Sequence, residues 1–171
     1  VGRAREIQTL VNDMDRLAEG GSTFRVVVGE YGAGTTFFLN LLRTVALEKK
    51  MVVANADLNP DRRLHASGGQ AKSLYTELVR NMTTRSKPEG GALPGIVEKF
   101  VSSAQAVAKA TGITTDAAIH QKLEQLKELV NGYDFADVIA AYYKGFSEGN
   151  DQLKSDAIRW LRGEFSTKTQ A

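Results

Sequence analysis

A run of eight residues holds the residue types best suited to binding a phosphate group. In order it reads Gly29, Glu30, Tyr31, Gly32, Ala33, Gly34, Thr35 and Thr36, and Phe37 follows it. The three glycines in this run let the backbone curl, so that successive N–H groups point toward one anion. A helix that begins directly after the loop would add the partial positive charge of its N-terminus. The chemistry predicted here is therefore the binding of a nucleotide's phosphates.

The spacing matches the Walker A pattern G-x-x-x-x-G-K-[ST] at every position except one. The hydroxyl of Thr36 falls where the pattern ligates Mg²⁺. Thr35 stands where the pattern has lysine, so the ammonium that would bridge the β- and γ-phosphates is absent while the backbone cradle remains. We therefore expect ATP and Mg²⁺ to bind weakly or not at all, expect no ATP hydrolysis, and assign no catalytic residue. Thr35 is explained either by a natural loss of the lysine or by an engineered substitution. The loop as a whole has an alternative interpretation, in which it binds no phosphate and only connects a strand to a helix.

The segments on either side of the loop predict a strand, a helix and a second strand. Residues 24–28 form a short β-branched run of the kind buried in parallel sheets, residues 35–49 have apolar residues at helical spacing, and residues 51–56 form a second apolar run. We therefore expect an α/β fold, in which residues 1–60 are the N-terminal part of a P-loop nucleotide-binding domain with a parallel sheet. Because two parallel strands make too small a sheet, we expect the chain to end before its Walker B strand.

Beyond residue 60 the hydrophobic periodicity is almost entirely helical. Two helices are predicted before that point, over residues 3–19 and 35–49. Five are predicted after it, over residues 71–85, 96–110, 116–130, 134–148 and 151–162. Residues 61–171 are therefore expected to form a helical section, either an insertion into the nucleotide-binding domain or a lid on it.

Composition narrows the class of protein. Of the 171 residues, 42% are hydrophobic and 25% are charged, which is enough apolar material for a packed core. A net charge of +2 is too small to predict a nucleic-acid carrier from bulk electrostatics. No apolar run approaches the roughly 20 residues of a membrane span, so no membrane partner is expected. The absence of cysteine excludes disulfides and thiolate metal sites and fits a cytoplasmic protein.

The first residues form a second, partial motif. Residues 1–6, Val-Gly-Arg-Ala-Arg-Glu, resemble the hydrophobic-G-R-E-x-E entry motif of AAA+ and related signalling ATPases, with Ala4 in place of the usual acidic residue. In those families the motif lies beside the adenine base. The resemblance therefore implies that Gly2 and Arg3 flank the adenine of a bound nucleotide.

Taken together, the start VGRAREIQTL, the loop segment VVVGEYGAGTTFFLNLLR, the segment ADLNPDRRLH and the late WLRGE give the chain a family likeness. They resemble the ATP-binding proteins of bacterial BREX phage-defence systems, the BrxC/BrxD-like P-loop proteins, whose loop normally reads GEYGAGKT. The likeness spans nearly the whole chain. It implies the N-terminal fragment of an AAA+-like ATPase that assembles with other subunits of the same protein and works with other defence-system proteins. DNA is a further partner that the resemblance allows.

An alternative function belongs to a different class. If the glycine-rich loop is a relic, the chain is a nucleotide-independent assembly or partner-binding module whose helices bind other proteins. That alternative predicts no shift of thermal stability on adding nucleotide. A DNA-contacting domain using Arg62, Arg63 and Lys72 is less favoured, because the net charge is close to zero.

Overall fold

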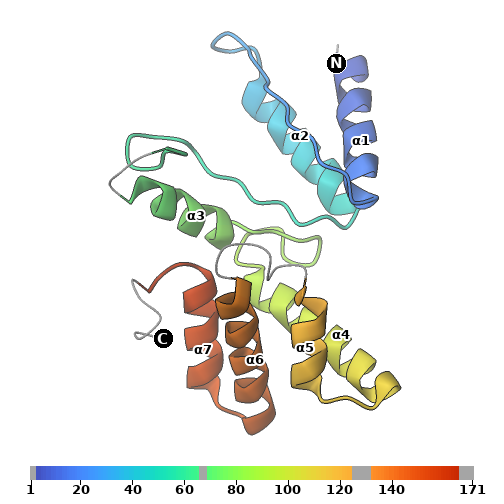
Figure 1. Ribbon diagram of the computed structural model, residues 1–171. Coiled ribbons are helices and arrows are strands. Elements are labelled where there is room, and N and C mark those ends of the chain that lie inside the picture. The colour runs from blue at the N-terminus through green and yellow to red at the C-terminus, as the bar shows by residue number, and fades with distance from the viewer. Residues whose placement is uncertain (1–2, 66–68, 125–131, 166–171) are drawn as a thin grey trace. The chain divides into compact units, whose positions relative to one another are not determined.

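The computed structural model describes residues 3–65, 69–124 and 132–165, and within these ranges it contains seven α-helices and no β-strand (Figure 1). The helices are α1 (Ala4–Ala18), α2 (Thr35–Glu48), α3 (Gln70–Arg80), α4 (Leu93–Thr111), α5 (Thr115–Lys122), α6 (Gly132–Glu148) and α7 (Asp151–Leu161). The chain divides into two compact units. The N-terminal unit comprises Val1–Val53 and Thr83–Pro88, and the C-terminal unit comprises Ala54–Met82 and Glu89–Ala171.

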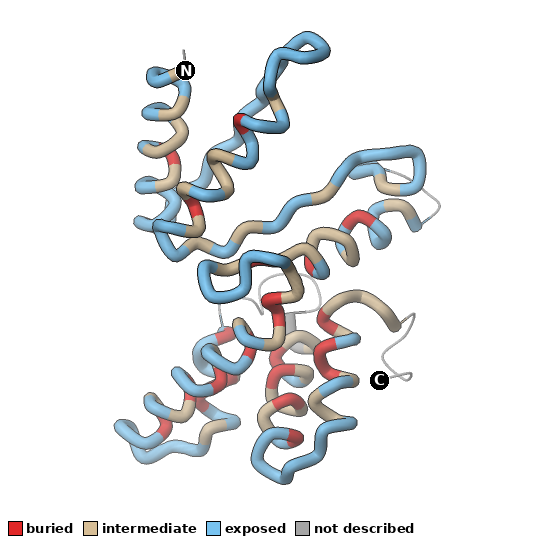
Figure 2. The backbone as a smooth tube through the Cα atoms, turned by 180° about the vertical axis from the view of Figure 1, so that it is seen from behind, coloured by how far each residue is buried: buried red, intermediate tan, exposed pale blue. Residues whose placement is uncertain are grey.

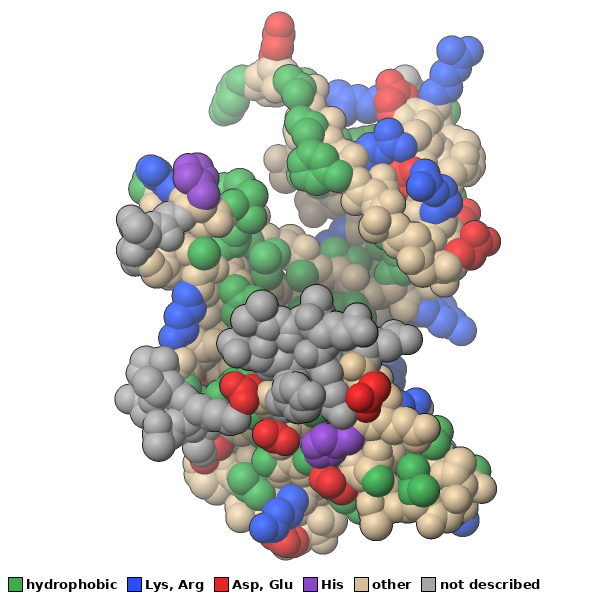
Figure 3. All heavy atoms as spheres, in the orientation of Figure 1, with side chains coloured by type: hydrophobic (Ala, Val, Ile, Leu, Met, Phe, Trp, Pro, Cys, Tyr) green, Lys and Arg blue, Asp and Glu red, His purple; other side chains and the backbone are tan. Residues whose placement is uncertain are grey.

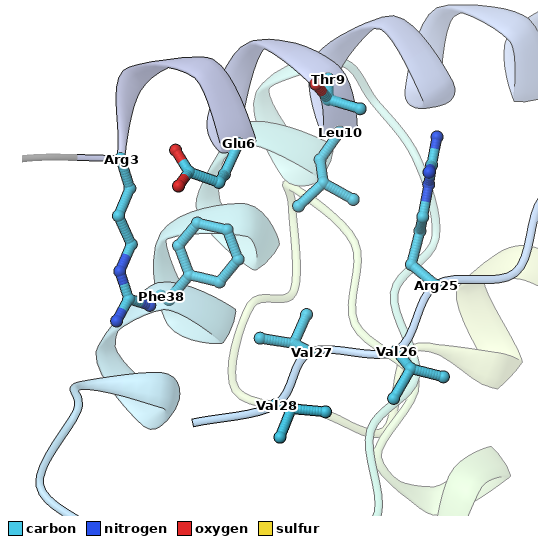
Figure 4. Close-up of a pocket in the computed structure, with 9 residues that line it drawn as sticks. All are labelled: Arg3, Glu6, Thr9, Leu10, Arg25, Val26, Val27, Val28 and Phe38. Atoms are coloured by element: carbon cyan, nitrogen blue, oxygen red, sulfur yellow. The ribbon is translucent and has the colours of Figure 1, made fainter. Parts of the chain in front are cut away.

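The N-terminal unit holds α1, α2 and the extended segment between them. Both helices form because apolar residues recur at helical spacing along them. Residues 21–30 then run without regular secondary structure from the end of α1 to the glycine-rich loop. Within this segment Val27 points toward Leu10 of α1, whereas Val26 and Val28 point away (Figure 4). The alternation is that of an extended chain with one side against a helix.

The predicted parallel sheet over residues 1–60 is wrong: the described residues form an all-helical structure rather than an α/β fold. Residues 24–28 are extended, but Phe24 is 87% exposed and Val28 is 89% exposed. In the second predicted strand, Val53 makes a single antiparallel bridge to Thr83, and the two predicted strands do not pair with each other. The physical reason is that β-branched composition reports only a preference, while a sheet requires a neighbouring strand to take the backbone hydrogen bonds.

The C-terminal unit carries the larger hydrophobic core (Figure 2). Its most deeply buried side chains come from three different helices: Ala104 of α4, Ala118 and Ile119 of α5, and Ala136 of α6, all 0% exposed. Two of the helices have side-chain caps, because Thr114 accepts a hydrogen bond from the backbone N–H of Ala117 and Asn150 accepts one from that of Leu153. Among the described residues, no helix is both long and apolar enough to cross a membrane.

The last residue of α7 and the residues that follow it attach α3 to this unit. The Tyr75 hydroxyl donates to the carbonyl of Leu161 at 2.7 Å, and Lys72 donates to the carbonyl of Phe165 at 2.9 Å. Arg80 pairs with Glu164 at 3.2 Å. The late segment WLRGE therefore acts in packing, as the attachment point of α3.

Candidate functional site: the glycine-rich loop and α1

The glycine-rich loop contains a tight turn directly before α2. The N–H of Ala33 donates to the carbonyl of Glu30 at 3.0 Å, which closes a turn over residues 30–33. Gly32, the third residue of that turn, has φ of 83°, and Gly34, the residue before α2, has φ of 76°. Side chains other than glycine are strained at such angles. Gly32 and Gly34 are thus required by the backbone conformation of this loop.

Gly29 is needed for space rather than for its backbone angle. A Cβ atom placed on Gly29 would lie 2.8 Å from Oγ1 of Thr35 and 3.2 Å from Cβ of Ala33. The loop therefore folds back so that Thr35 comes over the residue that begins the motif. This close approach brings both ends of the predicted phosphate loop together.

The N-terminus of α2 is open to an anion. Its N-cap is Gly34, no side chain caps its first turn, and no acidic residue occurs in that turn. The first N–H groups of a helix have no partner within the helix and carry a partial positive charge. Thr35 is half-buried and Thr36 is exposed at this end. The arrangement can accept a negatively charged group at the backbone of residues 34–36.

Arg3 reaches the loop from the start of α1. Its Nη2 atom donates a hydrogen bond to the carbonyl oxygen of Ala33 at 2.5 Å. Its guanidinium carbon lies 5.4 Å from the centre of the Phe38 ring (Figure 4). The structure thus brings Arg3 and the loop together, although they are thirty residues apart in sequence. Gly2, the other residue predicted to flank adenine, lies outside the described residues.

Two cavities lie beside this contact. One of about 530 Å³ is lined by Arg3, Ile7, Ala33, Gly34, Phe37, Phe38 and Leu41. The other, of about 480 Å³, lies between α1 and the extended segment and includes Arg3, Arg25 and Phe38 (Figure 4). Both volumes fall in the range of small-molecule sites. The first cavity joins the loop to an exposed aromatic ring, Phe37, and can receive a flat apolar group next to the anion position.

Sequence reasoning missed an ion pair that fixes the approach to the loop. Asp13 of α1 is buried and accepts from Nε and Nη2 of Arg25 at 2.6 and 2.9 Å. The hydrogen bond from Arg25 lowers the pKa of Asp13, and the same bond raises the pKa of Arg25. The sequence signal for this pair is weak: Asp13 lies on a predicted helix, and Arg25 follows twelve residues later within an apolar run. Such a combination is too common to predict a contact.

Other predicted residues are placed less closely. Glu30 and Tyr31 are exposed at the tip of the loop, and Tyr31 is fully exposed. Within the described ranges, no group of three or more His, Asp or Glu side chains could hold a metal ion. A metal ion at Thr36 would therefore need its further oxygen ligands from bound phosphate and water.

Comparison with known protein families matches the whole chain. The family described as BREX system ATP-binding protein BrxC/D matches residues 1–171. Comparisons with curated proteins and with solved structures gave no match. The family expected from the loop, the ADLNPDRRLH segment and the WLRGE segment is therefore confirmed. The chain belongs to the BREX system ATP-binding protein BrxC/D family.

Proposed function

We propose that this chain is the ATP-binding portion of an AAA+-like ATPase of a BREX defence system, with a nucleotide site weakened at the Walker A lysine position. The observation that carries the proposal is the open N-terminus of α2 behind the Gly29–Gly34 loop, in a chain of an ATP-binding family. Backbone N–H groups at a helix N-terminus are well suited to phosphate.

In this proposal the predicted site residues that the structure describes have defined roles. Glycines 29, 32 and 34 shape the cradle, and the backbone of residues 30–36 supplies N–H groups to the phosphates. The hydroxyl of Thr36 ligates Mg²⁺. The base occupies the cavity of about 530 Å³ that Arg3 and Phe37 line.

Thr35 weakens this site because it cannot supply the lysine ammonium. A hydrogen bond to a charged group contributes about 1.5–3 kcal/mol, which corresponds to roughly ten- to hundredfold in Kd. The same absence argues against ATP hydrolysis by this chain. We further propose that the helical section is an insertion or lid of the parent ATPase, which works with further subunits and other defence proteins and can include DNA among its partners.

The test is Mg-ATP binding by calorimetry to the chain itself and to Thr35→Lys. Thr44→Lys is the matched control, because it adds the same charge to an exposed position of the same helix, away from the loop. We expect Thr35→Lys to tighten binding at least tenfold and Thr44→Lys to leave it unchanged. If neither the chain nor Thr35→Lys binds Mg-ATP, the proposal fails and the nucleotide-independent assembly module becomes the better explanation.

A further inference from the structure

The contact between Arg3 and Ala33 fixes the orientation of one peptide group in the loop. In a planar trans peptide the C=O and the N–H point in opposite directions. The carbonyl of Ala33 is turned toward Arg3, which donates to it at 2.5 Å. The N–H of Gly34, on the other side of the same peptide, must therefore point away from the guanidinium. This N–H belongs to the residue that caps α2.

Other backbone hydrogen bonds hold the groups on either side of this peptide, since the N–H of Ala33 donates to the carbonyl of Glu30 at 3.0 Å. The carbonyl of Gly34 is already held by the first helical hydrogen bond, from the N–H of Phe38 at 2.9 Å. Gly34 has no Cβ, so its own φ can vary more freely than that of another residue. The hydrogen bond from Arg3 opposes a flip of the 33–34 peptide, because a flip would turn the Ala33 carbonyl away from the guanidinium.

The guanidinium is itself held in place. It lies over the ring of Phe38, which is buried on α2. A planar guanidinium can rest on an aromatic face and donate to a carbonyl at the same time, whereas an ammonium is a compact, strongly hydrated charge. The guanidinium of Arg3 is therefore held by two contacts, the Phe38 ring and the Ala33 carbonyl, when it binds the loop.

Helix α1 holds the segment around the loop at two points. Arg3 binds Ala33 within the loop, and Asp13 binds Arg25 at the start of the extended run that leads into it. Ten residues of helix separate Arg3 from Asp13, a rise of about 15 Å. Helix α1 and its N-cap residue therefore hold both ends of residues 25–33 in place.

We propose that Arg3 is a positioning residue for the phosphate site: through the Ala33 carbonyl it turns the Gly34 N–H toward the bound phosphate, and it makes nucleotide affinity depend on α1. This assignment rests on the proposed function, and it gives Arg3 a role in orienting the loop that is separate from lining the cavity of the base. A residue that touches the base affects ligands that carry a base, while a residue that orients the loop affects any polyphosphate.

The test compares Mg-ATP with inorganic triphosphate, which has no base, in the Thr35→Lys chain. Arg3→Ala is the main variant and Arg3→Lys the conservative one. Arg5→Ala is the matched control, because Arg5 is an exposed arginine on the same turn of α1. We expect Arg3→Ala to weaken both ligands by about tenfold, the loss of one charge-assisted hydrogen bond. Arg3→Lys should recover part of this loss, and Arg5→Ala should change neither affinity more than twofold.

Each outcome decides the assignment. Weakening of ATP alone means that Arg3 acts only through the base, and unchanged affinity for both ligands means that it does not act on the loop. Either result overturns the proposal. The backbone amide resonance of Gly34 gives a second readout that needs no ligand, and it should shift in Arg3→Ala but not in Arg5→Ala. If Thr35→Lys binds neither ligand, the proposed function fails and the phosphate role of Arg3 fails with it. The Gly34 resonance then tells whether Arg3 still orients the loop: a shift shows that it does, and no shift overturns that as well.

Discussion

The carboxylate of Asp13 accepts two hydrogen bonds from the guanidinium of Arg25, at 2.6 and 2.9 Å. A bidentate pair of this kind fixes orientation as well as distance. Asp13 is 5% exposed, although it stands on a helix whose apolar residues are only partly buried. The pair therefore anchors the extended segment to α1 at a place where few apolar contacts are available to do so.

The Asp13 pair should make the N-terminal unit sensitive to acid. Arg25 holds the pKa of Asp13 below its ordinary value of 3.8 in the folded chain. The pair's contribution to stability is therefore complete above that value and is lost as the pH falls through the lowered pKa of the folded state, because the unfolded chain takes up its proton first. We expect Asp13→Asn to unfold more easily at pH 6 and to lose less further stability between pH 5 and pH 3.

Urea unfolding at several pH values measures this difference. Glu19→Gln is the control, because Glu19 is an exposed carboxylate just beyond the end of the same helix. Parallel acid dependence in the chain and in Asp13→Asn would show that the pair does not stabilise the fold.

Two glycines of the loop should respond differently to the same substitution. Gly29→Ala places a Cβ 2.8 Å from Oγ1 of Thr35, so removing that hydroxyl should relieve the strain. Gly32→Ala meets no neighbour, but it strains a backbone with φ of 83°. We expect each single variant to cost about 1–2 kcal/mol of unfolding free energy. Adding Thr35→Ala should recover part of the loss for Gly29→Ala and nothing for Gly32→Ala.

A double-mutant cycle from chemical denaturation gives the coupling energy directly. Equal coupling of Thr35 to both glycines would contradict the close approach of Thr35 to Gly29.

Local patterns predicted where helices lie better than where they end, because helical spacing is a property of neighbouring residues. The predicted helix 71–85 runs five residues past the end of α3 at Arg80, and the predicted helix 116–130 runs past the end of α5 at Lys122. The predicted helices at 35–49, 134–148 and 151–162 lie within two residues of α2, α6 and α7. Helix α4 begins earlier than predicted, at Leu93, because Pro94 is tolerated in a first turn where no helical N–H bond is needed. Residues 125–130 of the predicted helix 116–130 lie outside the described residues.

Pairings between distant residues could not be predicted. The β-branched run at 24–28 predicts a strand of a sheet. What holds this part of the chain is instead the ion pair of Arg25 with Asp13 and the hydrogen bond from Arg3 to the carbonyl of Ala33. Neither contact leaves a periodic signal, because an arginine donates equally well to many carbonyls and carboxylates. The glycines at 32 and 34 were predictable, since their conformation is local.

Replacing two glycines of the C-terminal unit by alanine should change the stability of the fold in opposite directions. Gly95 lies in the first turn of α4 with nothing within 4 Å of an added Cβ, so Gly95→Ala should stabilise the fold by about 0.5–1 kcal/mol through helix propensity. In α6, a Cβ on Gly145 would lie 3.0 Å from the carbonyl oxygen of Asn150 and the backbone nitrogen of Lys154. Gly145→Ala should therefore cost about 1–3 kcal/mol by forcing α6 and α7 apart.

Thermal unfolding of the two variants checks this prediction. Destabilisation by Gly95→Ala, or tolerance of Gly145→Ala, would mean that the helix start or the packing of α6 on α7 differs from the structure described here.

The hydroxyl of Tyr75 gives a test of how α3 is attached. It donates to the carbonyl of Leu161 at 2.7 Å, and burial raises the pKa of Tyr75 above its ordinary value of 10.0. The protonated hydroxyl therefore stabilises the fold fully below that value, and the contribution is lost as the pH rises through the raised pKa of the folded state. Tyr75→Phe should lower the unfolding free energy by about 1 kcal/mol at neutral pH, the typical worth of one hydrogen bond. It should also remove part of the loss of stability at alkaline pH, whereas Tyr31→Phe, which alters a fully exposed ring on the loop, should do neither. Equal stability of Tyr75→Phe and the chain at neutral pH, measured by urea unfolding, would show that the WLRGE segment does not hold α3 through this bond.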